Sequence, residues 1–171
     1  HPDVNGIGFT GSPATGQRIA ERGAGKPMML ELGGNGPVIV FEDADLDAAA
    51  SAVAGGAFYN AGQVCAATGR VLAHRSIVEP LAKRLVELTA AQILGDPLQQ
   101  GTTMGPLNNP KVVAKIHEHV DDAVAKGATV LAGGKARPDG RFEVAVDVGR
   151  RHVDRRLRDQ PGALDERLEG A

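Results

Sequence analysis

The chain has 171 residues, a net charge of −2 and 42% hydrophobic residues. Its length allows one ordinary domain or parts of two. Charged residues make up 23%, and no apolar run approaches the ~18–20 residues of a membrane-spanning helix. The composition therefore favours neither a nucleic-acid-binding nor a membrane protein. Aromatic residues are only 3%, so the core must consist of Leu, Val, Ile and Ala.

Two features of the sequence indicate the context of the chain, namely its first residue and its single cysteine. Residue 1 is His rather than Met, and no signal-peptide pattern opens the chain, so we interpret it as an internal segment of a longer protein. Cys65 is the only cysteine. Without a disulfide framework, the chain is expected in a reducing compartment, the cytoplasm.

Residues 5–10 are predicted to form a strand, followed by a Gly-rich turn from Gly11 to Gly16 and a helix from Pro13 or Ala14 to Arg22. Such a turn presents free backbone N–H groups at a helix N-terminus, where an anion is favoured. It is not a Walker loop, because Gln17 stands where Lys is required. A plain strand–turn–helix connection, with Ser12 as the helix cap, explains the pattern equally well.

Residues 27–32 are predicted to form a second strand, closed by Gly33 and Gly34. Glu31 lies in its apolar run, and a carboxylate is costly to bury unless it is paired or neutral. A buried Glu31 would suit general-base chemistry. The alternative is an outward-facing Glu31 on a half-exposed strand.

The apolar segment 37–41 is predicted to be a third, fully buried strand, and strands alternating with helices indicate a parallel α/β sheet. An Ala-rich helix is predicted after the acidic segment 42–45. Carboxylates at the start of a helix interact favourably with the helix dipole, so we interpret this segment as a helix start rather than a metal site, and no metal is predicted. Residues 70–74 form a strand that ends in His74, expected at the surface. Ser76, with Glu79 three residues on, is predicted to open the next helix.

Asn109 and Pro110 are predicted to open a last clear helix, which Gly127 ends, and residues 128–131 to form a further strand. Between the two final helices lies a long, turn-rich loop from Gly95 to Leu107.

Cys65 has the strongest chemical signal. An isolated free cysteine is usually a small core residue. Here Gly62 and Gln63 precede it and small residues follow it, leaving room for a substrate to reach the sulfur. A thiolate is an effective nucleophile towards carbonyl carbon and needs a base within reach, for which Glu31 is the best candidate.

Four segments in order carry a resemblance to the aldehyde dehydrogenase superfamily. They are 9–12 with Gly16, 31–34, 62–65, and 95–97 with 105–107. They are similar to the family's cofactor-phosphate turn, glutamate motif, nucleophile motif and the segment that follows it. Glu31 and Cys65, 34 residues apart, are the most specific pair. The resemblance covers about residues 3–138, a middle slice of a family member.

The resemblance implies NAD(P)-dependent oxidation of an aldehyde, in which Cys65 forms a thiohemiacetal and then a thioester, and Glu31 activates the hydrolytic water. It implies that Gly11, Ser12 and Gly16 lie at the cofactor pyrophosphate, and Leu32 and Gly33 near the nicotinamide. It further implies that residues 1–34 end the Rossmann-like cofactor domain and that residues 35–138 begin the catalytic domain. The longer enzyme is expected to be a homo-oligomer, a dimer or tetramer.

Parts of the family pattern are absent. The Asn that donates the second oxyanion hydrogen bond, and the residues that hold the adenosine ribose, would precede residue 1. NAD and NADP therefore stay equal alternatives, and the aldehyde is not identified. Two other functions stay open: a non-catalytic remnant of the enzyme, and a thiol-dependent esterase that needs no cofactor.

Residues 139–171 differ in character from the rest. They carry seven Arg and no Lys, with eight Asp and Glu that neutralise them. We interpret the segment as the product of a frame change in a GC-rich coding sequence, with a genuine tail as the alternative. It is expected to be disordered or only locally helical.

Overall fold

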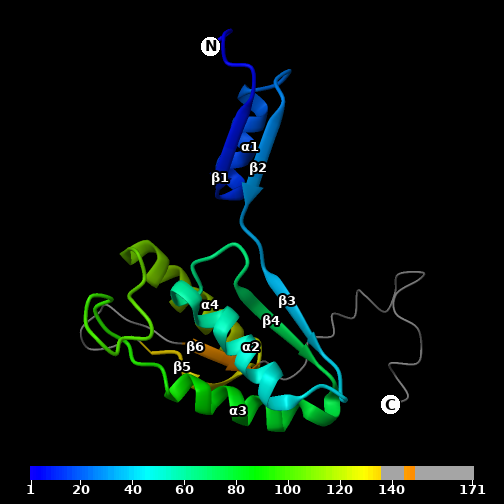
Figure 1. The fold of residues 1–171 in the computed structure, drawn as a ribbon, viewed down its shortest axis with the longest axis vertical. Helices are drawn as coiled ribbons and strands as arrows, with labels where there is room; N and C mark the ends of the chain where they lie inside the picture. Colours follow the sequence, from blue (N-terminus) through cyan, green and yellow to red (C-terminus); the bar gives the residue numbers. More distant parts are fainter. Residues whose placement is uncertain (136–144, 149–171) are drawn as a thin grey trace.

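The computed structural model describes residues 1–135 and the backbone of residues 145–148. Its first unit, here called the arm, consists of β1 (Ile7–Gly11), α1 (Pro13–Arg22) and β2 (Met28–Leu32). The two strands are parallel, with Gly11 opposite Leu32. Figure 1 shows the arm projecting from the remainder, to which the short segment after β2 connects it.

The α1 helix begins and ends where its sequence predicts. Ser12 caps it by accepting a hydrogen bond from the Thr15 N–H at 3.2 Å, and Pro13 occupies the first turn, where no N–H is needed. At the other end the Gly23 N–H donates to the Ile19 carbonyl. The prediction of this strand–turn–helix unit is confirmed.

The second unit, the body, repeats the same connection. It contains β3 (Gly36–Val40), α2 (Leu46–Phe58), a 3₁₀ turn η1 (Tyr59–Gly62), β4 (Thr68–Ala73), a second 3₁₀ turn η2 (Arg75–Ile77) and α3 (Val78–Ala90). β3 and β4 are parallel. The α2 and α3 helices pack on one face of this strand pair, around a core of Val40, Ala50 and Leu81.

The expectation that residues 37–41 are fully buried is wrong. Val40 is 4% exposed, whereas Ile39 is 62% and Phe41 59% exposed. The helices among the described residues cover one face of the β3–β4 pair, and side chains alternate between the two faces of a strand. In the register, Ile39 lies opposite Leu72, which is also exposed, so the open face is apolar.

Ser76 does not open α3. The chain first makes the η2 turn, and the His74 side chain takes the capping role by accepting from the Ser76 N–H at 3.4 Å. α3 then starts at Val78. Its Arg84 bonds to Glu87 and, across to α2, to Asp47. These two carboxylates raise the pKa of Arg84 above its ordinary value.

The last part holds α4 (Pro110–Ala125), β5 (Thr129–Gly133) and β6 (Ala145–Val148). Asn109 caps α4 through bonds from the N–H groups of Lys111 and Val112, as predicted. β6 pairs antiparallel with β5, so these four residues of the segment 139–171 are a strand, contrary to the expectation of disorder. The rest of that prediction lies outside the described residues.

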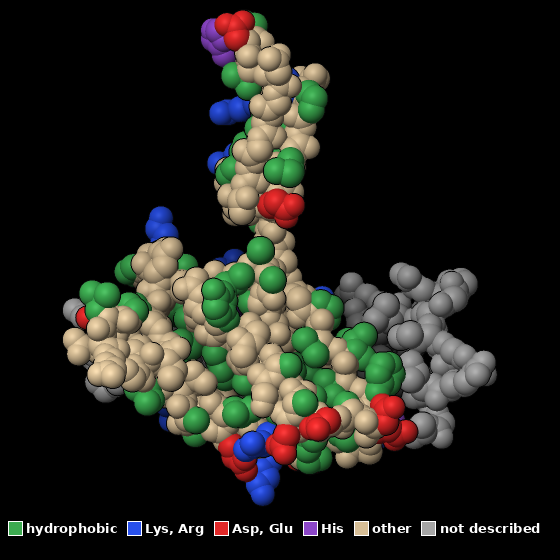
Figure 2. All heavy atoms as spheres, in the orientation of Figure 1, with side chains coloured by type: hydrophobic (Ala, Val, Ile, Leu, Met, Phe, Trp, Pro, Cys, Tyr) green, Lys and Arg blue, Asp and Glu red, His purple; other side chains and the backbone are tan. Residues whose placement is uncertain are grey.

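The surface distribution of side chains follows this arrangement. Figure 2 shows acidic and basic side chains gathered along the lower edge of the body, where α3 lies in Figure 1, with hydrophobic side chains spread over the face above. Among the described helices, none combines the length and the apolar character that crossing a membrane requires.

Candidate active site

Cys65 lies between η1 and β4, in the segment that leads into the strand. Its side chain is exposed, so the thiol is open to solvent. Just beyond it the Ala67 N–H donates to the Val64 carbonyl at 3.1 Å, and β4 begins at Thr68. A turn therefore presents Cys65 at the amino end of a strand, which is a geometry that leaves a nucleophile accessible.

The three residues before this turn have an unusual backbone. Asn60, Ala61 and Gly62 have φ values of 51°, 56° and 74°, all in the left-handed region. This conformation costs a non-glycine residue about 1–2 kcal/mol, and Ala61 has no polar side chain to compensate for it. Strain of this kind persists only where the surrounding structure holds it, and it is found at functional sites.

Hydrogen bonds hold the 60–62 loop from both sides. The Gln63 N–H donates to the Asn60 carbonyl at 3.1 Å, and the Asn60 side-chain amide donates to the Gln63 carbonyl at 3.3 Å. The Gln63 side chain adds a bond to the Asn60 carbonyl at 3.0 Å. The loop before Cys65 is thus closed on itself.

Two glycines that follow Glu31 lie against the turn that carries Cys65. A Cβ atom placed on Gly34 would lie 2.9 Å from the Cys65 carbonyl oxygen, and one on Gly36 would lie 2.6 Å from the Ala67 carbonyl oxygen. Both separations are too short for a side chain. Residues 34–36 therefore run against the backbone of the nucleophile segment, and this close approach requires glycine.

Glu31 lies on β2 with its side chain exposed. Along this strand Met28, Leu30 and Leu32 are half-buried and Met29 and Glu31 are exposed, so Glu31 lies on the face opposite α1. The outward-facing alternative is the one observed. The structure brings the backbone of the Glu31 motif to that of the Cys65 motif and leaves the carboxylate on the open face of the arm.

The five candidate cofactor residues lie together at one edge of the arm, where both parallel strands end. Gly11 pairs with Leu32, and Ser12 caps α1. Gly33 follows β2 and lies against the first turn of α1, with its added Cβ 3.6 Å from a Pro13 ring carbon. The free end of a parallel sheet beside a helix N-terminus is where phosphates bind in α/β folds.

Gly16 has a packing role that sequence reasoning did not identify. A Cβ at this position would lie 2.5 Å from a Leu32 methyl carbon, and Gly16 is buried. Glycine therefore lets α1 approach β2 closely. The expectation that Gly16 also contacts a ligand stays a prediction.

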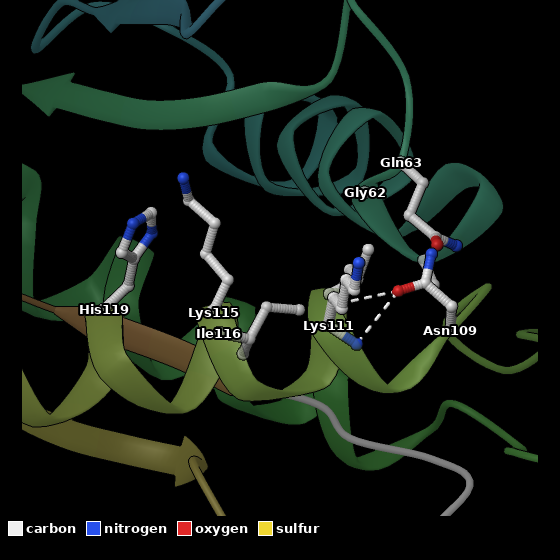
Figure 3. A pocket seen from close by; sticks show the side chains of 9 residues that line it. Gly62, Gln63, Asn109, Lys111, Lys115, Ile116 and His119 are labelled. Atoms are coloured by element: carbon white, nitrogen blue, oxygen red, sulfur yellow. Dashed lines mark hydrogen bonds between the residues drawn. The ribbon is translucent and has the colours of Figure 1, made fainter. Parts of the chain in front are cut away.

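Sequence reasoning also missed the surroundings of Gln63. Its Oε1 accepts a hydrogen bond from the Asn108 N–H at 2.8 Å, across 45 residues of sequence. A cavity of about 500 Å³ lies beside this contact, between the 61–63 loop and the α4 face that carries Lys111, Lys115 and His119. Figure 3 shows Gln63 beside Asn109 at the start of the helix, with Lys115 and His119 further along it. A contact between such distant residues leaves no local signal.

In the part of the chain that the structure describes, no group of His, Cys, Asp and Glu could hold a metal ion. His74 is half-buried rather than at the surface: its Nδ1 lies 2.8 Å from the Ser76 hydroxyl and 3.4 Å from a Glu42 carboxylate oxygen. Through its contact with Ser76, His74 caps the η2 turn.

The family model and the similar sequences all indicate one family. Residues 1–146 match the model of the aldehyde dehydrogenase family, so the match extends past residue 138, where we expected the resemblance to end. The chain is 42% identical over 141 residues to a chloroplastic betaine aldehyde dehydrogenase of Amaranthus hypochondriacus, covering 81% of this chain and 28% of the relative. It is 42% identical over 149 residues to a glutarate-semialdehyde dehydrogenase of Pseudomonas putida, covering 85% and 31%.

Solved structures agree. An NAD-dependent aldehyde dehydrogenase from Sinorhizobium meliloti superposes with a TM-score of 0.82 at 37% identity, over 86% of this chain and 30% of that one. An NADP-dependent enzyme of E. coli gives a TM-score of 0.83 at 40% identity, over 86% and 31%. The chain thus has the α/β fold of these enzymes over the matched part and spans less than a third of their length. It belongs to the aldehyde dehydrogenase family.

Proposed function

We propose that this chain is part of a longer NAD(P)-dependent aldehyde dehydrogenase, with residues 1–34 at the end of its cofactor domain and residues 35–138 at the start of its catalytic domain. The observation that carries the proposal is the approach of Gly34 to the Cys65 carbonyl oxygen, 2.9 Å from an added Cβ. Two motifs that are 34 residues apart thereby meet, one from each unit.

The chemistry that we assign to Cys65 is nucleophilic. Its thiolate attacks the aldehyde carbonyl carbon to form a thiohemiacetal, and the Cys65 N–H donates to the oxygen that gains charge. Loss of hydride from that carbon leaves a thioester on the sulfur. The exposed position of Cys65 supports this role, because an aldehyde can reach it.

Glu31 is the proposed general base for the second half of the reaction. It takes a proton from water as the water oxygen attacks the thioester carbonyl carbon, which releases a carboxylic acid and returns the thiol. The support for this role is the resemblance together with the approach of Gly34, in the same motif, to the Cys65 backbone.

The cofactor accepts the hydride when it is bound. Gly11, Ser12 and Gly16 would hold its pyrophosphate at the N-terminus of α1, and Leu32 and Gly33 would lie near its nicotinamide. The shared edge of β1 and β2 fits this group, because Gly11 and Leu32 pair there beside the α1 cap. Similar enzymes include both NAD- and NADP-dependent ones, so either dinucleotide fits the proposal.

We place the longer protein in the cytoplasm as a homo-oligomer, acting on a small aldehyde. A betaine aldehyde dehydrogenase of Staphylococcus aureus, 35% identical to this chain, was solved with NAD⁺ and a BME-modified cysteine, which supports a reactive thiol in the family.

Alkylation tests the nucleophile. In the intact protein, iodoacetamide should label Cys65 and abolish dehydrogenase activity in step with labelling, since an accessible thiolate reacts fast. Labelling is followed by mass spectrometry of the peptide, with Cys65→Ser as the unlabelled control. Full labelling of Cys65 with unchanged activity would show that the nucleophile is another group.

Substitution tests the base. Glu31→Gln in the intact protein should slow thioester hydrolysis by about 10²-fold or more while sparing hydride transfer, so a burst of NADH precedes a slow steady state. Stopped-flow absorbance measures both phases. Glu21→Gln, an exposed carboxylate on α1 of the same arm, is the matched control and should behave as wild type. Equal turnover for the two variants would assign Glu31 to structure.

A further inference from the structure

The Gln63 side chain links the nucleophile segment to a distant part of the chain by a hydrogen bond. Its Nε2 donates to the Asn60 carbonyl at 3.0 Å, and its Oε1 accepts from the Asn108 N–H at 2.8 Å. Both hydrogen-bonding ends of the amide are therefore occupied. One end closes the 60–62 loop and the other holds the residue that precedes the α4 cap.

The loop on which Gln63 acts needs support. Asn60 and Ala61 are the two non-glycine residues of the described chain with positive φ, and they lie next to each other, followed by Gly62 at 74°. A run of three left-handed residues is held by its surroundings rather than by its own preference. Gln63 bonds to the first of the three and is itself the residue that follows the third.

Cys65 is two residues beyond Gln63, on the same short segment. Its carbonyl oxygen faces Gly34, so its backbone is limited on that side by close approach. On the other side the segment is limited by Gln63 and, through Gln63, by Asn108. Changes at the start of α4 can thus reach the backbone that presents the thiol.

We infer that Gln63 is the positioning residue of the site: its amide fixes the left-handed loop before Cys65 and couples it to the 108–109 segment at the start of α4. The inference rests on the proposed function only in taking Cys65 as the nucleophile. The contact itself is a property of the chain and is measured without activity.

Two substitutions separate the two ends of the amide. Gln63→Leu removes both the donor and the acceptor at similar size. Gln63→Glu keeps an acceptor for the Asn108 N–H but has no donor for the Asn60 carbonyl. The matched control is Gln92→Leu, because Gln92 also bonds at both ends, donating to the Leu88 carbonyl and accepting from the Thr103 hydroxyl, away from Cys65.

Hydrogen exchange of the full chain, followed by NMR of individual amides, tests the coupling. Gln63→Leu should speed exchange at Asn108 and across the 63–67 amides by tenfold or more, with α2 and α3 unchanged. Gln63→Glu should restore protection at Asn108 alone, and Gln92→Leu should leave both segments as in wild type. An unchanged exchange rate at Asn108 in Gln63→Leu would overturn the inference, independently of whether Cys65 is the nucleophile.

Kinetics of the intact protein test the positioning role. Gln63→Leu should lower kcat by about tenfold or more with KM changed less than threefold, since the substrate still binds but meets a misplaced thiol. Gln63→Glu should recover part of the loss. Wild-type kcat in Gln63→Leu would reject positioning, whereas full activity in Cys65→Ser would reject the proposed function instead.

Discussion

The arm and the body are built from the same unit, a parallel strand pair joined by one helix, but they differ in what covers it. In the body, α2 and α3 together bury Val40, Ala50 and Leu81 to 4%, 0% and 3% exposure. In the arm, α1 covers its strands alone, and the buried positions described there are the glycines Gly16 and Gly23. The second helix in the body is what buries apolar side chains and creates a hydrophobic core.

The comparison separates two kinds of functional support. Cys65 follows a helix that packs into the core of the body, through a strained loop tied by hydrogen bonds. Glu31 and the cofactor candidates lie on a strand pair with an open face, where Met29 is 67% exposed. The proposed nucleophile therefore has a rigid support within the described residues, whereas the proposed base and cofactor edge lie on a strand pair with an open face.

The largest expected effect is a complete absence of dehydrogenase activity in the chain alone. By the proposed function, the arm would supply one edge of a pyrophosphate site and no adenosine site. The resemblance also puts one of two oxyanion donors outside residues 1–171, and loss of one donor costs ~10²–10³ in rate. Absorbance of NADH and NADPH with short aldehydes at pH 8 measures this.

The control for that measurement is the Cys65→Ser chain. Steady cofactor reduction well above the control would show that the arm forms a working cofactor site without further residues. The arm would then not need neighbours from outside this chain. Hydrolysis of an aryl ester without nucleotide, if abolished in Cys65→Ser, would favour the esterase alternative over a non-catalytic remnant.

Much of the fold could be predicted because its signals are local. The caps Ser12 and Asn109 and the stop at Gly23 fixed two helices within a residue. The prediction of a fully buried β3 was wrong, since an apolar strand does not reveal how many faces are covered. The predicted start of α3 was wrong because the chain first makes the η2 turn, which His74 caps, and α3 follows at Val78 without a side-chain cap.

The site was predictable only in its residue types. The roles of Cys65 and Glu31 stay predictions from chemistry and motif, and the left-handed conformation of Asn60 and Ala61 has no sequence signal beyond the tolerance of Asn. The bond from Asn108 to Gln63 joins residues 45 apart, and only the folded chain brings them together.

An intermediate effect is expected from truncation of a core leucine. Leu81→Ala should lower the free energy of unfolding of the body by about 2–5 kcal/mol, because the side chain is 3% exposed and leaves a cavity. Leu30 is half-buried on β2, in the other unit. Leu30→Ala should therefore change the opening free energies of the α2 and α3 amides by less than about 1 kcal/mol, because distant sites act independently. Native-state hydrogen exchange measures both. Equal effects on α2 would show that the two units unfold as one.

The smallest effect distinguishes strain from ordinary helix preference. Ala61 has φ of 56°, a conformation that glycine adopts without the Cβ clash, so Ala61→Gly should leave the free energy of unfolding unchanged or raise it by up to ~1 kcal/mol. Ala52→Gly, at an exposed position inside α2, should lower it by about 1 kcal/mol, since glycine weakens a helix interior. Urea unfolding followed by circular dichroism compares the two variants. If Ala61→Gly destabilised the chain as much as Ala52→Gly, the loop before Cys65 would carry no strain, and its hydrogen bonds would only accompany a relaxed backbone.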